Sequence, residues 1–151
     1  MKEGMKQLRV LGHPAHVPLT HFPLALWTLG FVGDLLFWWR QDPFWWHFSF
    51  WNIALGLGIG SLTLVTGFYD YFFLPEGRPL TLDAATRHMM VMLTAASCFG
   101  VSLYFHRGEA TVGSTPQILA LASSGIGTLF LHWGGWLGGQ LVYYFGVGSR
   151  D

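Results

Sequence analysis

Charge and cysteine are what this sequence has least of. Charged side chains make up 11% of its 151 residues, well below the roughly 25% of an ordinary soluble domain, and the formal net charge is zero. Without a basic excess, nothing indicates a nucleic-acid partner. Cys98 is the single cysteine, which excludes a disulfide framework within the chain.

Residue arrangements that carry common catalytic chemistry are also missing. The sequence shows no paired carboxylates, no nucleophile beside a general base and no phosphate-binding loop, so it does not indicate a hydrolase or a kinase. No internal repeat, soluble second domain or low-complexity tail is evident either. We therefore do not expect a catalyst that acts on its own.

Apolar and aromatic residues are what the sequence has in abundance. Hydrophobic residues make up 52% of the chain, and its 8 Trp, 13 Phe and 5 Tyr suit the aromatic belts of an integral membrane protein. Four apolar stretches come close to the ~20 residues that cross a ~30 Å hydrocarbon core. The predicted spans are approximately 19–39, 52–74, 85–106 and 117–137.

Short polar breaks separate these stretches, at 40–43, 75–79 and 107–116. Short connections make consecutive helices antiparallel neighbours. The sequence therefore predicts an all-α fold, with a single membrane domain over residues 1–151. This domain is an up-down-up-down four-helix transmembrane bundle with short interfacial segments at both termini.

The distribution of Lys and Arg predicts the orientation. In a four-span bundle, both termini and the second connection lie on one side of the membrane, and the other two connections lie on the opposite side. Cytoplasmic segments carry an excess of Lys and Arg, so the richer side is the cytoplasm. One side has Lys2, Lys6, Arg9, Arg78, Arg87 and Arg150, and the other has Arg40 and Arg107. We therefore expect a multi-pass protein with both termini in the cytoplasm.

Ionisable residues interrupt the spans at a similar depth. One lies near the cytoplasmic end of each predicted helix: His21, Asp70, His88 and His132. The opening segment 12–23, GHPAHVPLTHFP, adds His13 and His16 just above this level, and its prolines predict an extended lead-in that becomes helical near 19–23. Buried polar groups in membranes tend to face the bundle interior and to mark function, so we predict a specific site in this layer.

Haem b is the first candidate occupant of the layer. Neutral imidazoles are standard axial ligands, and two histidines on facing helices can hold one iron from both sides. We expect His21 and His88 to form this pair if the first and third helices lie diagonally across the bundle. Arg87 at the surface would neutralise the propionates. The competing ligands are His132 and His16.

A divalent metal is the second candidate, held by some of the same side chains. The available ligands are His13, His16, His21, His88, His132 and Asp70. The spacing His13-x-x-His16 permits chelation of one ion. The third candidate is no cofactor at all, with polar side chains that only bind the four helices to each other.

Asp34 interrupts the first span on the other side of the membrane. It lies 13 residues beyond His21, or roughly 20 Å along a helix, so it cannot join the cytoplasmic layer. A carboxylate inside a span needs a partner in the bundle interior. We expect Asp34 to face the bundle and to pair with Arg40 or His47.

Several motifs resemble one family. The opening LGHPAHVPLTHFPLALW, followed by GDLLFWW, is similar to the start of a bacterial membrane family called domain of unknown function 2231, which opens with Gly-His-Pro-x-His and His-Phe-Pro. TGFYDY at 66–71, RHMMVML at 87–93 and GGWLGGQLVYYFGVG at 134–148 resemble its later segments. The resemblance extends from residue 12 to residue 148. It implies a four-helix domain of a bacterial inner membrane, without an agreed activity.

A small bundle with short connections and no soluble catalytic domain predicts an electron-transfer or accessory subunit, and haem b in the layer would make it part of a membrane redox complex. Such a subunit would bind haem b and carry electrons, or anchor partner subunits that are themselves membrane-embedded or peripheral redox proteins. The aromatic run at 44–51, on the outer side, would suit a quinone headgroup or a neighbouring subunit. The alternatives are a cofactor-free structural or assembly subunit, and a metal-binding or transport protein.

Overall fold

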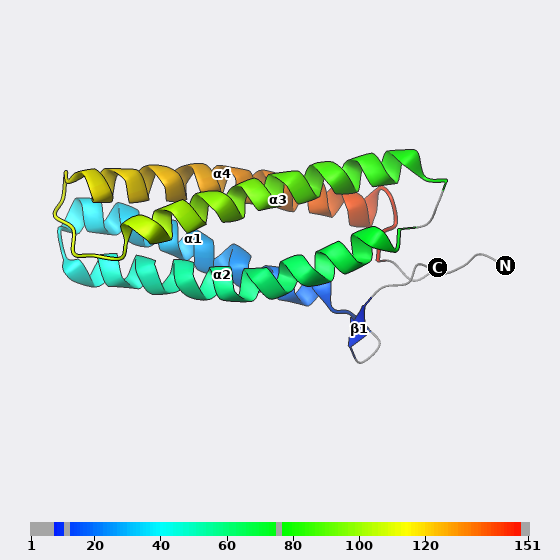
Figure 1. Cartoon of the computed structure of the whole chain (residues 1–151), viewed down its shortest axis with the longest axis horizontal. Coiled ribbons are helices and arrows are strands. Elements are labelled where there is room, and N and C mark those ends of the chain that lie inside the picture. The colour runs from blue at the N-terminus through cyan, green and yellow to red at the C-terminus, as the bar shows by residue number, and fades with distance from the viewer. Residues whose placement is uncertain (1–7, 11–12, 75–76, 149–151) are drawn as a thin grey trace.

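The computed structural model describes residues 8–10, 13–74 and 77–148, without the side chains of residues 9, 10 and 13. Four long helices account for most of the described residues (Figure 1). Their bounds are α1 His16–Arg40, α2 Pro43–Phe72, α3 Pro79–Phe105 and α4 Thr115–Tyr143. An antiparallel ribbon of β1 (Arg9–Val10) and β2 (His13–Pro14) precedes them. The predicted all-α four-helix bundle is confirmed.

The helices alternate in direction, as predicted. Figure 1 shows the 41–42 and 106–114 connections at one end, which we call the loop end, and β1, the end of α2 and the start of α3 at the other, the terminal end. Consecutive helices form two tight hairpins, α1 with α2 and α3 with α4. The hairpins meet less extensively, through α1 with α4 and α2 with α3, so α1 and α3 lie diagonally opposite.

Proline and a few caps set the helix boundaries. Asp42 caps α2, because its carboxylate accepts a hydrogen bond of 2.9 Å from the Phe44 N–H. Pro43 occupies the first helical position, where no N–H is needed. Gln41 follows α1 as its C-cap, with a left-handed φ of 57°, and its N–H donates a hydrogen bond of 2.9 Å to the Phe37 carbonyl oxygen. The first turns of α3 and α4 also contain proline.

α1 begins earlier than predicted. Its first helical residue is His16, rather than a residue between 19 and 23. Pro18 lies in the first turn, where its missing N–H leaves no hydrogen bond unmade, and so it does not delay the helix. Pro23 lies inside the helix and is buried. The early start places His16 in the bundle rather than in a lead-in above it.

Aromatic rings fill the middle of the bundle. Trp27 of α1 and Phe99 of α3 stack across the diagonal, with 4.9 Å between ring centroids. A Cβ added at Gly56 would lie 2.5 Å from the Trp27 indole, so the close approach of α1 and α2 requires glycine there. The other buried members of this core are Ile53, Ala95 and Leu131.

The outer surface of the bundle is apolar. All four helices are long and apolar enough to cross a membrane. Large side chains such as Leu62, Val65 and Leu129 are 59%, 66% and 74% exposed. A surface of this kind, on helices that satisfy their own backbone hydrogen bonds, is suited to lipid. The lipid bilayer is therefore a partner of this protein.

The two hairpins are equivalent, which the sequence alone did not reveal. Most buried residues of the first hairpin have a buried counterpart in the second, 72 positions later from α1 and 71 positions later from α2. The buried pairs from α1 are Pro23–Ala95, Trp27–Phe99, Gly30–Ser102 and Asp34–His106, and those from α2 include Ser49–Ala120, Ile53–Ser124, Gly56–Gly127 and Thr63–Gly134. Both hairpins start at the terminal end, so an approximate two-fold axis runs along the bundle. The equivalence lies in burial alone and not in residue identity, so it is not visible as a repeat in the sequence.

Candidate functional site

His16 and His88 are the interior imidazoles of the terminal end. His16 lies on α1 and His88 on α3, at equivalent positions 72 residues apart. We call them the open layer, together with the α2 and α4 residues that contact their rings. Those residues are Thr63, Thr66, Gly67, Gly134 and Gly138.

A carbonyl oxygen of the neighbouring helix holds each ring. Nδ1 of His16 lies 3.0 Å from the Thr63 carbonyl oxygen, and Nδ1 of His88 lies 2.9 Å from that of Gly134. The Thr66 hydroxyl also lies 3.1 Å from Nδ1 of His16. Because a carbonyl oxygen only accepts, Nδ1 carries the proton in both rings and Nε2 carries a lone pair. Among the described residues, neither Nε2 has a hydrogen-bond partner.

Glycines lie beneath both rings. A Cβ at Gly67 would lie 2.8 Å from Cε1 of His16, and a Cβ at Gly138 would lie 3.1 Å from Cε1 of His88. Each glycine follows the ring-holding carbonyl by four residues, so it lies one turn further along the same helix face. The imidazoles can lie against the backbone because these positions have no side chain.

The open layer is half-buried and contains few other ligands. Within the described ranges, no group of three or more His, Cys, Asp or Glu side chains could hold a metal ion. Of the alternative metal site, His16 and Asp70 can be placed, whereas the side chain of His13 lies outside the described part. The Asp70 carboxylate accepts a hydrogen bond of 3.1 Å from the Leu8 N–H, which fastens the β1–β2 ribbon to α2.

His21 and His132 face outward, which corrects the prediction that they line the layer. Both are exposed, and each ring contacts a carbonyl oxygen of its own helix, at 3.4 Å and 2.8 Å respectively. His21 follows His16 by five residues, which turns its side chain by about 140° around α1. The predicted pair of His21 with His88 therefore does not meet across the bundle. The pair that does share the interior is His16 and His88.

Arg87 lies at the surface of the terminal end. Its guanidinium contacts the Asp83 carboxylate one turn earlier on α3, and the two side chains are 67% and 58% exposed. An exposed pair of this kind is weak, so the guanidinium can exchange its partner for another anion. Its neighbour in sequence, His88, turns inward instead.

A second polar cluster surrounds Asp34 at the loop end. Its carboxylate lies 2.7 Å from Nε2 of His106 and accepts a hydrogen bond of 2.5 Å from the Ser124 hydroxyl. Nδ1 of His106 lies 2.8 Å from the Ser102 carbonyl oxygen. The Asp34 and His106 side chains are 1% and 0% exposed. We call these four residues the closed layer.

Asp34 faces the bundle as predicted, but its partner is neither Arg40 nor His47. Both of those residues are exposed. His106 reaches Asp34 because it occupies the equivalent position on the diagonal hairpin. Sequence reasoning assigned His106 no role, although a signal was present: its spacing of 72 residues from Asp34 equals the spacing of the two open-layer histidines.

Trp46 of α2 covers His106. The two rings stack with 4.0 Å between centroids, and the indole N–H donates a hydrogen bond of 2.8 Å to the Gly108 carbonyl oxygen. The aromatic run at 44–51 is thus divided between the interior and the surface. Trp46 is buried, whereas Phe44 and Trp51 are 58% and 61% exposed.

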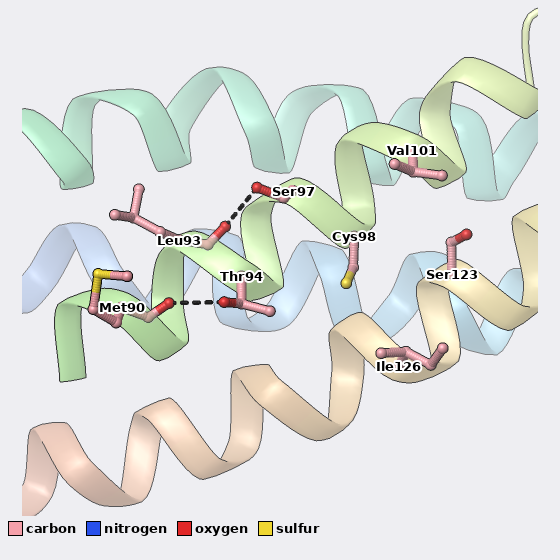
Figure 2. Close-up of a pocket in the computed structure, with 8 residues that line it drawn as sticks. All are labelled: Met90, Leu93, Thr94, Ser97, Cys98, Val101, Ser123 and Ile126. Atoms are coloured by element: carbon pink, nitrogen blue, oxygen red, sulfur yellow. Dashed lines mark hydrogen bonds between the residues drawn. The ribbon is translucent and has the colours of Figure 1, made fainter. Parts of the chain in front are cut away.

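A groove of ≈ 410 Å³ lies between α3 and α4, apart from both layers (Figure 2). Its lining contains no His, Asp or Glu. The hydroxyls of Thr94 and Ser97 donate to carbonyl oxygens of their own helix, each at 2.9 Å. Cys98 and Ser123 reach it from opposite helices. The groove therefore offers apolar contact rather than chemistry.

Comparison with known proteins agrees with the sequence motifs and with the fold. The model of a family described as predicted membrane protein, DUF2231, matches residues 12–151. No curated protein and no solved structure matches the chain. The family match includes all four helices and both polar layers. The chain therefore belongs to the DUF2231 family of predicted membrane proteins.

Proposed function

We propose that this protein is a haem b-binding subunit of a membrane electron-transfer complex, with Nε2 of His16 and Nε2 of His88 as axial ligands. The open layer carries the proposal, because it contains two interior imidazoles on diagonal helices, each with its proton on Nδ1 and a lone pair on Nε2. A hydrogen bond from the second ring nitrogen to a carbonyl oxygen is what orients histidine ligands in metal sites. One ring comes from each hairpin.

The donor set favours haem over a free divalent ion. Two imidazoles complete the coordination of an iron whose other ligands belong to a porphyrin. A protein-bound zinc ion needs three or four protein ligands, and the described residues gather no such group. Gly67 and Gly138 leave the backbone bare beside the rings. Exposed Arg87 at the same end supplies a cation for propionates.

Haem held in the open layer would supply a one-electron redox centre at the terminal end. The carbonyl oxygens of Thr63 and Gly134 hold and orient the two imidazoles. The described residues form one helical bundle, so the electron donor and acceptor would be other membrane or peripheral redox subunits, or a quinone dissolved in the bilayer. In a bacterial inner membrane with cytoplasmic termini, the haem would lie near the cytoplasmic face.

An absorption spectrum of the purified protein, expressed with haem supply, tests the proposal. Haem binding predicts a Soret band and sharp bands on reduction. His16→Ala and His88→Ala should convert a low-spin spectrum to high-spin or lose the haem, because each removes one bond to iron. Added imidazole should partly restore the spectrum. His21→Ala and His132→Ala are matched controls, since they remove exposed imidazoles from the same half of the bundle, and they should keep the wild-type spectrum.

Two results would contradict the proposal. A wild-type protein without a Soret band would make a cofactor-free structural or assembly subunit the better account. Haem that persists in the His16→Ala and His88→Ala variants and disappears with His21→Ala or His132→Ala would place the ligands on the outer surface instead of in the open layer.

Cysteine labelling tests the proposed orientation separately. In a Cys98→Ala background, Thr111→Cys puts a thiol in the exposed α3–α4 connection, and Tyr144→Cys puts one at the terminal end, where Tyr144 is 87% exposed. A membrane-impermeant reagent added from outside should label only the cysteine at 111. Labelling of only the cysteine at 144 would invert the topology and place the open layer at the outer face.

A further inference from the structure

We infer that the Asp34–His106 pair decides which hairpins associate, joining α1–α2 to α3–α4 of the same chain and disfavouring the pairing of like hairpins from two chains. The inference does not depend on haem. It rests on the equivalence of the hairpins, on the position of the pair and on the number of protons that the pair holds.

Apolar packing discriminates weakly between the two hairpins. They bury equivalent positions over much of their length, so each offers a similar surface to its neighbour. The central contact is the stack of Trp27 on Phe99, and two like aromatic rings would stack as readily as these two unlike ones. Contacts between hairpins are also less extensive than those within each hairpin. A further feature must therefore select the partner.

Asp34 and His106 occupy equivalent positions and contact each other at 2.7 Å, so the approximate two-fold axis relates one to the other. Two first hairpins that paired in the same way would bring Asp34 against Asp34. Two second hairpins would bring His106 against His106. The unlike contact arises only when a first hairpin meets a second one.

The hydrogen bonds set the number of protons in the pair. Nδ1 of His106 faces the Ser102 carbonyl oxygen and so carries a proton. The bond between Nε2 and the Asp34 carboxylate contains one more proton, and the pair is neutral whichever of the two atoms holds it. Its other polar contacts are the hydroxyls of Ser124 and Ser102, and Trp46 covers the ring; no other titratable side chain among the described residues contacts the pair.

Neither an Asp34–Asp34 contact nor a His106–His106 contact would have the neutral charge and matched hydrogen bond of the Asp34–His106 pair. Two carboxylates in a site that is 0–1% exposed would need an extra proton to avoid a buried like-charge contact, and two imidazoles would lack an anion. Only the unlike pair is neutral and has its donor and acceptor matched. The buried pair therefore contributes partner choice as well as stability.

Exchange variants of the full chain test this inference. Asp34→His gives both hairpins a histidine at this position, and His106→Asp gives both an aspartate. Each should reduce the monomer-to-dimer ratio in detergent about tenfold or more, measured by light scattering after gel filtration, and should lower the thermal midpoint. The double variant D34H/H106D restores an unlike pair at equivalent positions, so it should recover most of the monomer. A double variant as dimeric as the two single variants would overturn the inference.

Ser49→Ala is the matched control. It removes a buried hydrogen bond of 2.7 Å to the Gly30 carbonyl oxygen, inside the first hairpin and outside the closed layer. It should lower the thermal midpoint and leave the protein monomeric. Dimers of Ser49→Ala as abundant as those of the single exchange variants would show that general destabilisation causes them, which would contradict the inference.

Disulfide crosslinking in the native membrane tests the same inference for variants that unfold or aggregate in detergent. Phe31 and Gly125 meet where α1 contacts α4, since a Cβ at Gly125 would lie 3.2 Å from the Phe31 ring. With Cys98→Ala and cysteines at 31 and 125, oxidation should link the two sites within one chain. Asp34→His or His106→Asp should reduce the yield of this link, because residue 31 faces α2 of another chain when like hairpins pair. A wild-type yield of the link in both variants would overturn the inference.

Discussion

The open and closed layers occupy equivalent positions of the two hairpins, and only the closed layer is complete. Each contains a residue of α1 and the residue 72 positions later: His16 and His88, each held by a carbonyl oxygen of a neighbouring helix, and Asp34 and His106, which contact each other directly. The layers are 18 residues apart along the helices, or about 27 Å, which is close to the thickness of the hydrocarbon core. They therefore lie near opposite faces of the membrane.

The two layers differ in how many of their polar side-chain atoms have a hydrogen-bond partner. In the closed layer, both ring nitrogens of His106 and both oxygens of Asp34 have partners, and the side chains are 0–1% exposed. In the open layer, Nε2 of both rings has none among the described residues, and the rings are half-buried. A fully satisfied network makes a structure rigid, whereas free nitrogen lone pairs can bind a ligand. The comparison separates a stabilising layer from a binding layer.

The largest expected effect comes from breaking the closed layer. Asp34→Ala leaves His106 and Ser124 without their partner in a dry site and should reduce the free energy of unfolding by about 3–5 kcal/mol. His88→Ala, in protein prepared without haem, removes one hydrogen bond and should cost only about 1.5 kcal/mol. Reversible unfolding in mixed detergent measures both. Equal losses would remove the distinction between the layers.

Glycine substitutions between the layers test the equivalence of the hairpins. Gly56→Ala should cost about 1–3 kcal/mol, because the added Cβ would lie 2.5 Å from the Trp27 indole, which the stack on Phe99 holds in place. Gly127→Ala should cost less, because its Cβ would lie 3.0 Å from Phe99. Gly58→Ala is the control, since nothing lies within 4 Å of its Cβ, and helix propensity should leave it neutral or more stable. A destabilised Gly58→Ala would refute this packing argument.

Substitutions of the open-layer glycines test whether His16 and His88 bind haem. Gly67→Ala would place a Cβ 2.8 Å from the His16 ring, and should lower haem affinity about tenfold by displacing that ring from the Thr63 carbonyl oxygen. Gly138→Ala, with 3.1 Å to the His88 ring, should have a smaller effect. Haem titration followed by absorption measures both variants. Unchanged affinity in Gly67→Ala would argue against His16 as a ligand.

The smallest effect is expected for the exposed pair beside the open layer. Arg87→Ala removes a contact between side chains that are 67% and 58% exposed, so the thermal stability of the haem-free protein should change by no more than the 0–1 kcal/mol typical of surface ion pairs. Asp83→Ala should behave alike. If Arg87 also meets propionates, Arg87→Ala alone should weaken haem retention. A large loss of stability in both variants would show that this surface takes part in folding.

Composition and the positions of apolar runs were sufficient to predict the membrane class, the helices and their alternation. Length decides whether a helix can cross a bilayer, and short connections force antiparallel neighbours. The depth of His88 and the inward direction of Asp34 could also be predicted. These properties depend on residues that are close in sequence.

The face on which each polar residue lies was decided only by the tertiary structure. A helix that meets lipid on one side and protein on the other is apolar all round, so its periodicity does not distinguish inside from outside. His16 and His21 therefore looked equivalent in the sequence, although about 140° of helix rotation separates them. The internal repeat was hidden for a related reason. Packing preserves burial at matched positions while Trp27 replaces Phe99 and Asp34 replaces His106, so only the association of the two hairpins makes the pairs visible.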